Sequence, residues 1–304
     1  MRIVLRRDLS GNSDDRDTSS DGMASVNDIE LSMGTVQYSD SGGEGPVVVL
    51  LHGLLMDASL WDAVITDLAA DHRCIAPTLP LGAHRRPMSS GADLSLPGIA
   101  GLISELLERM DLHDVVLVGN DTGGALAQLV MREDAKRVGR VVLASCEAFD
   151  NLPPGLTGRA LAFAGKLPPA LFGLFMQQLR LRAVRRTALA FGTLTKRGDA
   201  TTAGWIRPLL EQPEIRRETV RMIRAVFADT SLLEKTAEEL AHFDRPALVV
   251  WAADDRVMPL DHGRRLAFQL PQARFTTVED SYTLIPLDQP GDLARLIREF
   301  AHPE

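Results

Sequence analysis

The sequence has little of what marks membrane-spanning, secreted or nucleic-acid-binding proteins. It contains no run of about 18 apolar residues, so we expect no transmembrane helix. The pair Arg6–Arg7 is followed by polar, acidic and Ser/Gly-rich sequence rather than by the apolar stretch of a signal peptide, and we predict a disordered tail over residues 1–26. A formal net charge of −8 argues against nucleic acid as a partner, because phosphate binding needs a basic surface. We therefore expect neither a membrane nor a nucleic acid among the partners.

Cysteine is scarce, and the two thiols, Cys74 and Cys146, stand in apolar surroundings. They make no disulfide framework and are typical of a protein kept in the reducing cytoplasm, buried rather than reactive. The sequence also lacks a cluster of metal ligands and a phosphate-binding loop. We therefore expect a cytoplasmic protein, a monomer or a homodimer, that acts on a small molecule with no metal and no other cofactor.

What the sequence does contain is an alternation of short apolar runs with helical patterns. With 304 residues and 45% apolar content, the chain can bury one substantial core. Strands are indicated over residues 29–33, 35–38, 46–51, 73–76, 115–119, 141–145, 247–251 and 274–278. Amphipathic helices separate most of them, one of which has Ser95 as its cap and Pro97 in its first turn. This order predicts an α/β fold whose mostly parallel central sheet is flanked by helices, with functional residues at the carboxyl ends of the strands.

The alternation stops between residues 147 and 243. This segment is helical in character and contains eleven arginines, from Arg159 to Arg224. A helical insertion in a parallel sheet is typical of a cap over the strand ends, so we predict a core of residues 27–146 and 244–304 with a cap of residues 147–243. Most of the arginines should face solvent, with one or two available to an anionic substrate.

Asp121 is the strongest candidate for a catalytic residue. It is the central residue of Gly-Asn-Asp-Thr-Gly-Gly, residues 119–124, between a buried strand and an amphipathic helix. A sharp strand-turn-helix needs small neighbours and exposes its central side chain at the top of the sheet, beside a helix N-terminus that favours an anion. We expect an ionised, accessible carboxylate; the alternative interpretation of the motif is a capped start of a helix.

Three further landmarks occur in a fixed order around this motif. His52 and Gly53 end the strand over residues 46–51, where the N–H of Leu54 would join that of Thr122 in an oxyanion hole. Asp255 follows the penultimate strand, and Asp288-Gln289-Pro290 opens the last helix. On these residues the chain resembles the α/β-hydrolase superfamily from about residue 47 to residue 300. The resemblance implies the α/β-hydrolase fold, with Asp255 as the acid of a catalytic triad.

An aspartate on the turn resembles, more narrowly, the haloalkane dehalogenase and epoxide hydrolase branch. The resemblance implies that the carboxylate of Asp121 displaces a leaving group and that a histidine-activated water cleaves the resulting ester. Glu147, just after the strand over residues 141–145, stands where some dehalogenases place their acid. The sequence favours the alternative for Glu147, a surface carboxylate at the hinge of the cap.

The chain departs from this branch at three places. Thr283 occupies the histidine position, and its hydroxyl cannot serve as an imidazole base. The halide-binding positions fall on Leu54 and Thr122, which do not donate as Asn and Trp do. Epoxide hydrolases protonate the opening oxygen with tyrosines of the cap, whereas Tyr38 and Tyr282 both lie outside it here.

Two hypotheses address the missing histidine. His84, in the loop after the strand over residues 73–76, opens toward the same sheet edge and is the best substitute base. Alternatively, Asp121 and Asp255, with or without Glu147, face each other and share a proton, so that one pKa rises and the other stays low.

Three functions follow from these observations. The first is a hydrolase of small, largely apolar molecules (epoxides, esters or carbon–halogen compounds) with Asp121 as nucleophile and a degenerate triad. The second is a lyase, isomerase or cyclase that uses Asp121 as an acid or base. The third is a catalytically silent ligand-binding protein, which a pocket filled by Leu54, Leu55 and cap side chains would favour.

Overall fold

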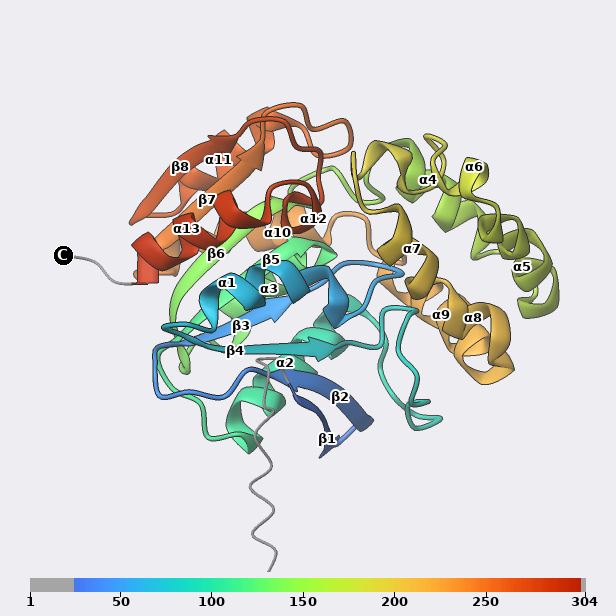
Figure 1. The fold of residues 1–304 in the computed structure, drawn as a ribbon, viewed down its shortest axis with the longest axis horizontal. Coiled ribbons are helices and arrows are strands. Elements are labelled where there is room, and N and C mark those ends of the chain that lie inside the picture. Colours follow the sequence, from blue (N-terminus) through green and yellow to red (C-terminus); the bar gives the residue numbers. More distant parts are fainter. Residues whose placement is uncertain (1–24, 302–304) are drawn as a thin grey trace, which may run out of the picture.

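An eight-stranded sheet forms the centre of the molecule (Figure 1). The computed structural model describes residues 25–301, and the strands lie in the order β1-β2-β4-β3-β5-β6-β7-β8. Their bounds are β1 Ser25–Leu31, β2 Gly34–Asp40, β3 Val47–Leu51, β4 Arg73–Thr78, β5 Val115–Asp121, β6 Val138–Cys146, β7 Ala247–Ala252 and β8 Ala273–Val278. β2 pairs antiparallel with β1 and β4, and the pairings from β4 across to β8 are parallel. The prediction of a mostly parallel sheet is confirmed.

Helices cover both faces of the sheet, which is why the central strands are apolar on both sides. β5 is buried at every position. On one face α1 (Asp62–Leu68) packs against α13 (Pro290–Ala301), and on the other α2 (Leu96–Arg109) packs against α3 (Thr122–Glu133). α11 (Leu260–Gln269) covers β7 and β8, and the four-residue helix α12 (Ile285–Asp288) precedes α13.

The polar N-terminal segment lies mostly outside the described residues. The predicted tail over residues 1–26 overlaps the structure at its last two residues only, because β1 begins at Ser25. Both cysteines are buried and free, as expected. Burial raises the pKa of the Cys74 thiol to about 12, which makes it unreactive as a nucleophile.

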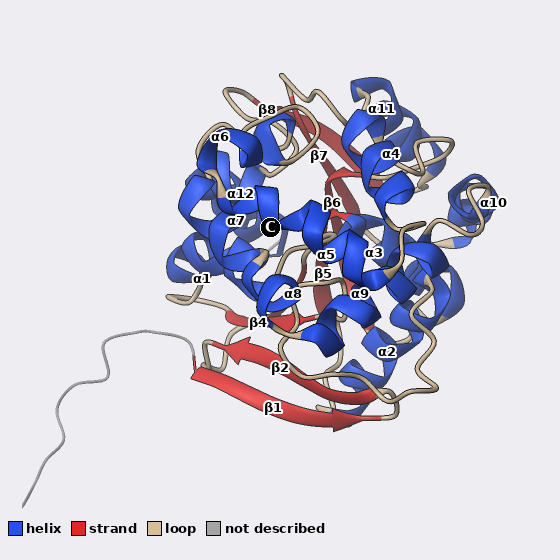
Figure 2. Ribbon diagram, turned by 90° about the vertical axis from the view of Figure 1, so that its right-hand side faces the viewer, coloured by secondary structure: helices blue, strands red, loops and turns tan. Residues whose placement is uncertain are grey.

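Between β6 and β7 the regular elements of the chain are helices. They are α4 Gly155–Ala164, α5 Pro169–Met176, α6 Arg182–Arg185, α7 Asp199–Trp205, α8 Arg207–Glu211, α9 Pro213–Val226 and α10 Leu232–Glu239, with short 3-10 segments between some of them. Figures 1 and 2 show α4 to α9 at the side of the molecule to which the central strands point. No helix within residues 25–301 is long and apolar enough to cross a bilayer.

Candidate active site

Asp121 occupies a sharp turn between β5 and α3. Its backbone adopts φ 55° and ψ −133°, a conformation that L-residues rarely adopt and that is found in strained functional turns. The neighbouring glycines leave no room for side chains. A Cβ at Gly119 would lie 2.3 Å from the Gly123 carbonyl oxygen, and one at Gly123 would lie 2.1 Å from that of Leu51. The turn is therefore possible only with the small residues that the sequence supplies.

One oxygen of the Asp121 carboxylate is held by backbone amides. Oδ1 accepts hydrogen bonds from the Thr122 N–H at 2.8 Å and the Leu54 N–H at 3.3 Å, and from the Thr122 hydroxyl at 3.1 Å. A Cβ at Gly53 would lie 2.0 Å from this oxygen, so only glycine permits its position. Oδ2 forms no hydrogen bond with any residue in the described part of the chain. The carboxylate is thus clamped through one oxygen while the other stays available.

Burial sets the ionisation of Asp121. Loss of solvent raises the pKa of its carboxyl to about 6, although the hydrogen bonds from Thr122 and Leu54 oppose the rise. The nearby negative charge of Asp255 adds a smaller upward contribution. Asp121 is therefore mostly ionised at pH 7 but can take up a proton in mildly acidic solution.

Glu147 is completely buried beside Asp121, which corrects the interpretation of a surface carboxylate. Its Oε1 lies 2.7 Å from the Thr122 hydroxyl, so Thr122 links the two carboxyl groups. Burial, and next the charge of Asp121, raise the pKa of Glu147 well above its ordinary value, which favours its neutral form. Because the Thr122 hydroxyl has a single hydrogen, it can donate to only one of the two carboxyl groups at a time.

Asp255 and Thr283 form a separate pair. The Thr283 hydroxyl donates to Asp255 Oδ1 at 2.8 Å, and the same oxygen accepts from the Val257 and Met258 N–H groups at 2.9 and 2.8 Å. Within residues 25–301 no hydrogen bond joins Asp255 to Asp121. Thr283, at the position where the resemblance implies a histidine, thus contacts Asp255, the residue for which the resemblance implies the role of the acid. The carboxyl group that is linked to Asp121 is Glu147, not Asp255.

His52 and His84 both form hydrogen bonds with residues other than Asp121. His84 lies 3.0 Å from a Glu218 carboxylate oxygen through Nε2 and accepts from the Gly82 N–H at 3.4 Å, and it does not line the cavity at Asp121. His84, which we expected to replace the missing histidine as a base, is thus hydrogen-bonded to Glu218 and Gly82 instead. His52 bridges the Gly53 carbonyl and the Leu79 N–H, both at 2.9 Å, and burial lowers its pKa to about 4. Neutral His52 fixes the loop that carries Leu54.

A cavity of about 340 Å³ lies between Asp121 and the helices that follow β6. Asp121 and Glu147 lie in its wall, and most of the remaining lining is apolar: Leu54, Leu55, Met56, Leu161, Ala164, Phe175, Met176, Leu179, Val184, Leu189, Ala190, Phe191, Leu194 and Val257. No arginine, lysine or histidine lines it among the described residues, so the arginines after β6 do not reach a substrate there. The cavity is open rather than filled by Leu54 and Leu55.

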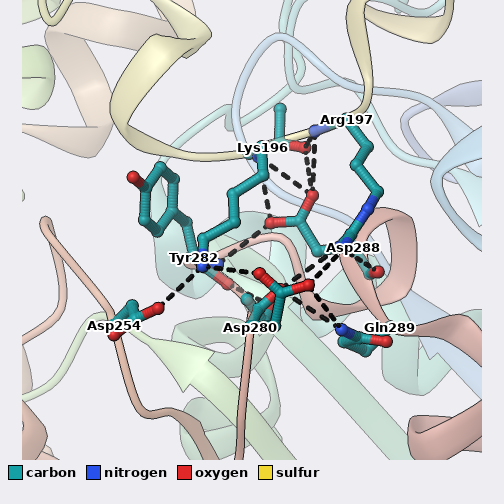
Figure 3. A network of polar contacts seen from close by, with 9 residues as sticks. Lys196, Arg197, Asp254, Asp280, Tyr282, Asp288 and Gln289 are labelled. Carbon is teal, nitrogen blue, oxygen red and sulfur yellow. Dashed lines mark hydrogen bonds and ion pairs between the residues drawn. The ribbon is translucent and has the colours of Figure 1, made fainter.

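A polar network ties the helical insertion to the loop that carries Thr283 (Figure 3). The buried carboxylate of Asp288 accepts from the backbone N–H groups of Lys196, Arg197 and Tyr282 at 2.9 to 3.1 Å. The Lys196 ammonium lies 3.0 Å from a carboxylate oxygen of Asp280. This network joins the segment before α7 to the loop after β8.

Sequence reasoning did not identify the Thr122 bridge. The motif drew attention to the N–H of Thr122, whereas its hydroxyl makes the contact between Asp121 and Glu147. A hydroxyl residue directly after the nucleophile position, together with an acidic residue directly after the next strand, is the signal that could have suggested it.

The sheet order, the strained Asp121 turn and the paired amides of Leu54 and Thr122 define an α/β-hydrolase-fold enzyme. The chain belongs to the alpha/beta hydrolase fold family, whose model matches residues 46–290. It is 30% identical over 268 residues to the non-heme chloroperoxidase CPO-A1 of Kitasatospora aureofaciens, covering 84% of this chain and 91% of that protein. It is 26% identical over 275 residues to haloalkane dehalogenase 2 of Mycobacterium tuberculosis, covering 89% and 93%. The crystal structure of wild-type Cfl2 from Burkholderia cenocepacia is 22% identical, with a TM-score of 0.72 over 91% of this chain and 95% of that one.

Proposed function

We propose that this protein is a hydrolase of small, largely apolar electrophiles and that Asp121 is its nucleophile. The observation that carries the proposal is that the two oxygens of the Asp121 carboxylate have different surroundings. Oδ1 is fixed by the Leu54 and Thr122 amides, while Oδ2 has no partner among residues 25–301 and Asp121 lines an apolar cavity. Such an oxygen can attack carbon, and the relative named haloalkane dehalogenase 2 supports this choice.

The same amides support the second half of the reaction. Attack of Oδ2 on the substrate gives an ester of Asp121, and water must then attack the Asp121 carbonyl carbon. The tetrahedral intermediate carries a negative charge on Oδ1, beside the two N–H groups that already hold this atom. The ester therefore forms with its oxyanion hole in place.

Glu147 is our candidate for the proton transfers that histidine performs in the wider branch. As a neutral acid it gives its proton to the oxygen released when an epoxide ring opens, and it becomes a carboxylate. It then takes a proton from the attacking water and returns to the neutral form. When the intermediate collapses, the remaining hydroxyl proton of the intermediate passes to the departing alkoxide, so that a diol and ionised Asp121 result.

These residues favour an epoxide over an alkyl halide. The positions that bind halide in dehalogenases carry Leu54 and Thr122, whose side chains offer no equivalent of paired N–H donors to an anion. Glu147 lines the cavity, and its Oε2 has no hydrogen-bond partner in the described part of the protein. When an epoxide opens, its leaving oxygen stays attached to the substrate as an alkoxide and needs a proton rather than a halide site. A site with an acid and no halide-binding side chains therefore suits an epoxide.

Intact-protein mass spectrometry tests the nucleophile. Wild type, Asp121→Asn and Asp121→Ala are incubated with apolar epoxides, alkyl halides and activated esters. We expect an adduct on wild type, mapped to Asp121, and none on either variant. Absence of both adduct and turnover with the whole panel would contradict the proposal.

The role of Glu147 is tested with Glu147→Gln. With epoxides, ester formation should slow by about 10²-fold or more, because general acid catalysis contributes on that scale. With alkyl halides the ester should form at the wild-type rate and persist, since halide needs no proton while hydrolysis still needs a base. Equal rates for wild type and variant with both classes would remove Glu147 from the mechanism and leave Asp121 as nucleophile.

One observation favours a second function. Thr122 links the carboxylate of Asp121 to Glu147, whose neutral form is favoured by burial, in a cavity that no described histidine lines. That pair could move a proton between two positions of a bound substrate, as a lyase or isomerase requires, without any water. Such an enzyme would incorporate no solvent oxygen into its product, whereas the hydrolase would.

A further inference from the structure

The segment over residues 151–198 has a charge opposite to that of the whole chain. It contains eight basic residues and no acidic residue, within a protein of net charge −8. Its helices α4, α5 and α6 lie at the outer edge of the molecule (Figures 1 and 2). Each of the three contributes residues to the lining of the cavity at Asp121. Basic charge is therefore concentrated on the side where the cavity lies.

Exposed apolar side chains gather on the same segment. Nine large hydrophobic residues are exposed in the described structure, and seven of them fall between Leu156 and Leu189: Leu156, Phe163, Leu171, Leu174, Phe175, Leu181 and Leu189. Phe163 is 70% and Leu174 69% exposed. Single exposed hydrophobic residues are ordinary, but seven of them on one segment of the chain are typical of an interaction surface.

Unpaired cations alternate with these side chains along the sequence. Arg159, Lys166, Arg180 and Arg186 are exposed, and none forms an ion pair with a residue in the range 25–301. We name the seven apolar and four basic side chains together the basic apolar face. Phe175 and Leu189 belong to this face and also line the cavity, so the face borders the route to Asp121.

We propose that the basic apolar face binds the surface of an anionic lipid bilayer. Apolar side chains beside free Arg and Lys are what an interfacial site needs, because the former enter the headgroup region and the latter attract anionic lipid. A second copy of this chain fits less well, since a two-fold contact would bring two unpaired positive faces together. The proposal replaces our expectation of a protein with no membrane partner, and it does not depend on the reaction at Asp121.

An apolar substrate would then reach the cavity from the lipid rather than from water. The border residues Phe175 and Leu189 lie at the contact between the bilayer and the cavity. Small apolar molecules concentrate in the bilayer for the same reason that apolar side chains leave water. The acidic remainder of the chain is repelled by the same lipids, which fixes the orientation of the protein on the membrane.

Sedimentation of the full chain with lipid vesicles tests the proposal. We expect binding to vesicles of equal parts phosphatidylglycerol and phosphatidylcholine, weakening as salt is raised, and little binding to phosphatidylcholine alone. The pair Phe163→Ala and Leu174→Ala, and separately the pair Arg180→Gln and Arg186→Gln, should each weaken binding by roughly tenfold or more. Matched controls outside the face, Phe268→Ala and Arg264→Gln, should bind like wild type.

Three results would overturn the proposal. The first is failure of wild type to bind anionic vesicles at low salt. The second is an equal loss of binding in the control variants, which would show that the face is not involved. The third is a dimer in sedimentation velocity that the Phe163→Ala and Leu174→Ala pair dissociates, which would show that a second copy covers the face. Circular dichroism of each variant confirms that the fold is retained.

Discussion

Among the individual residues, Asp121 stands out because its carboxyl group is buried and yet mostly ionised at pH 7. Its pKa of about 6 results from loss of solvent, which the amides of Thr122 and Leu54 only partly offset. A more polar turn would keep the carboxylate ionised in acid but would weaken it as a nucleophile, because a well-solvated anion is a poorer one. The apolar cavity therefore has a direct chemical consequence at this residue.

Asp121 should make stability depend on pH. Its pKa is about 6 when folded and near 3.8 as an ordinary group, so the native state binds more protons between these values and loses stability as pH rises through them. Asp121→Asn lacks this cost. We expect its free energy of unfolding, relative to wild type, to rise by on the order of 2–3 kcal/mol between pH 4 and pH 7. Denaturant titrations of both proteins measure this difference, and a constant difference across pH would contradict the account.

Gly53 should be irreplaceable for the position of the carboxylate. Gly53→Ala places a Cβ 2.0 Å from Asp121 Oδ1, so the carboxylate must leave the amides of Leu54 and Thr122. We expect loss of adduct formation by at least about 10²-fold, the scale of a lost oxyanion donor. Gly101→Ala, in α2 with open space around the new Cβ, is the matched control and should react normally. Wild-type reactivity of the Gly53 variant would show that the clamp on Oδ1 is unimportant.

Thr283 should prove structural rather than catalytic. Thr283→Val removes the hydroxyl that donates to Asp255 but leaves that oxygen its two backbone donors. We expect a loss of about 1–3 kcal/mol in the free energy of unfolding, with turnover within a few-fold of wild type. Thr283→Ser keeps the hydroxyl and should retain the stability. Loss of turnover in the valine variant but not in the serine variant would give the hydroxyl a part in the reaction.

For whole elements, the sequence predicted strands well where burial on both sides leaves only apolar residues. β3 and β5 came within two residues of their observed ends, and the Ser95 cap lies where it was expected, with its hydroxyl accepting from the Gly98 N–H. Glu147 could not be predicted in the same way. Glu147 is buried because β6, α3 and the helical insertion pack around it, and no local sequence pattern indicates that packing. The same holds for His84, whose partner Glu218 comes from the distant helix α9.

Asp288 should hold two elements together. It is 3% exposed and accepts from three backbone N–H groups and the Thr195 hydroxyl, which join the segment before α7 to the loop after β8. Asp288→Ala leaves these donors unsatisfied, and we expect the free energy of unfolding to fall by about 3 kcal/mol or more. Asp292→Ala, an exposed carboxylate in α13, should cost less than about 1 kcal/mol. Similar losses in both variants, measured by thermal unfolding, would contradict the role given to Asp288.

For the whole molecule, the order of elements could be predicted because apolar residues follow one another in short runs in the buried strands and recur every three to four residues in the helices. The place of the site followed from the same order, since parallel strands bring their carboxyl ends to one edge. The charge of the helical insertion was visible in the sequence, but the exposure of its side chains was not. The structure shows that the arginines are absent from the cavity lining and that several are exposed on the segment that also exposes apolar side chains.

The central claim is that Asp121 attacks the substrate as a nucleophile. A single turnover of an apolar epoxide in water enriched in ¹⁸O, with enzyme in excess, tests it most directly. The account predicts that the heavy oxygen enters the Asp121 carboxylate, as seen in the mass of its peptide, while the first diol carries none, because water attacks the enzyme ester. Heavy oxygen in the diol and none in Asp121 would contradict it, since water would then attack the substrate itself with Asp121 acting only as a base.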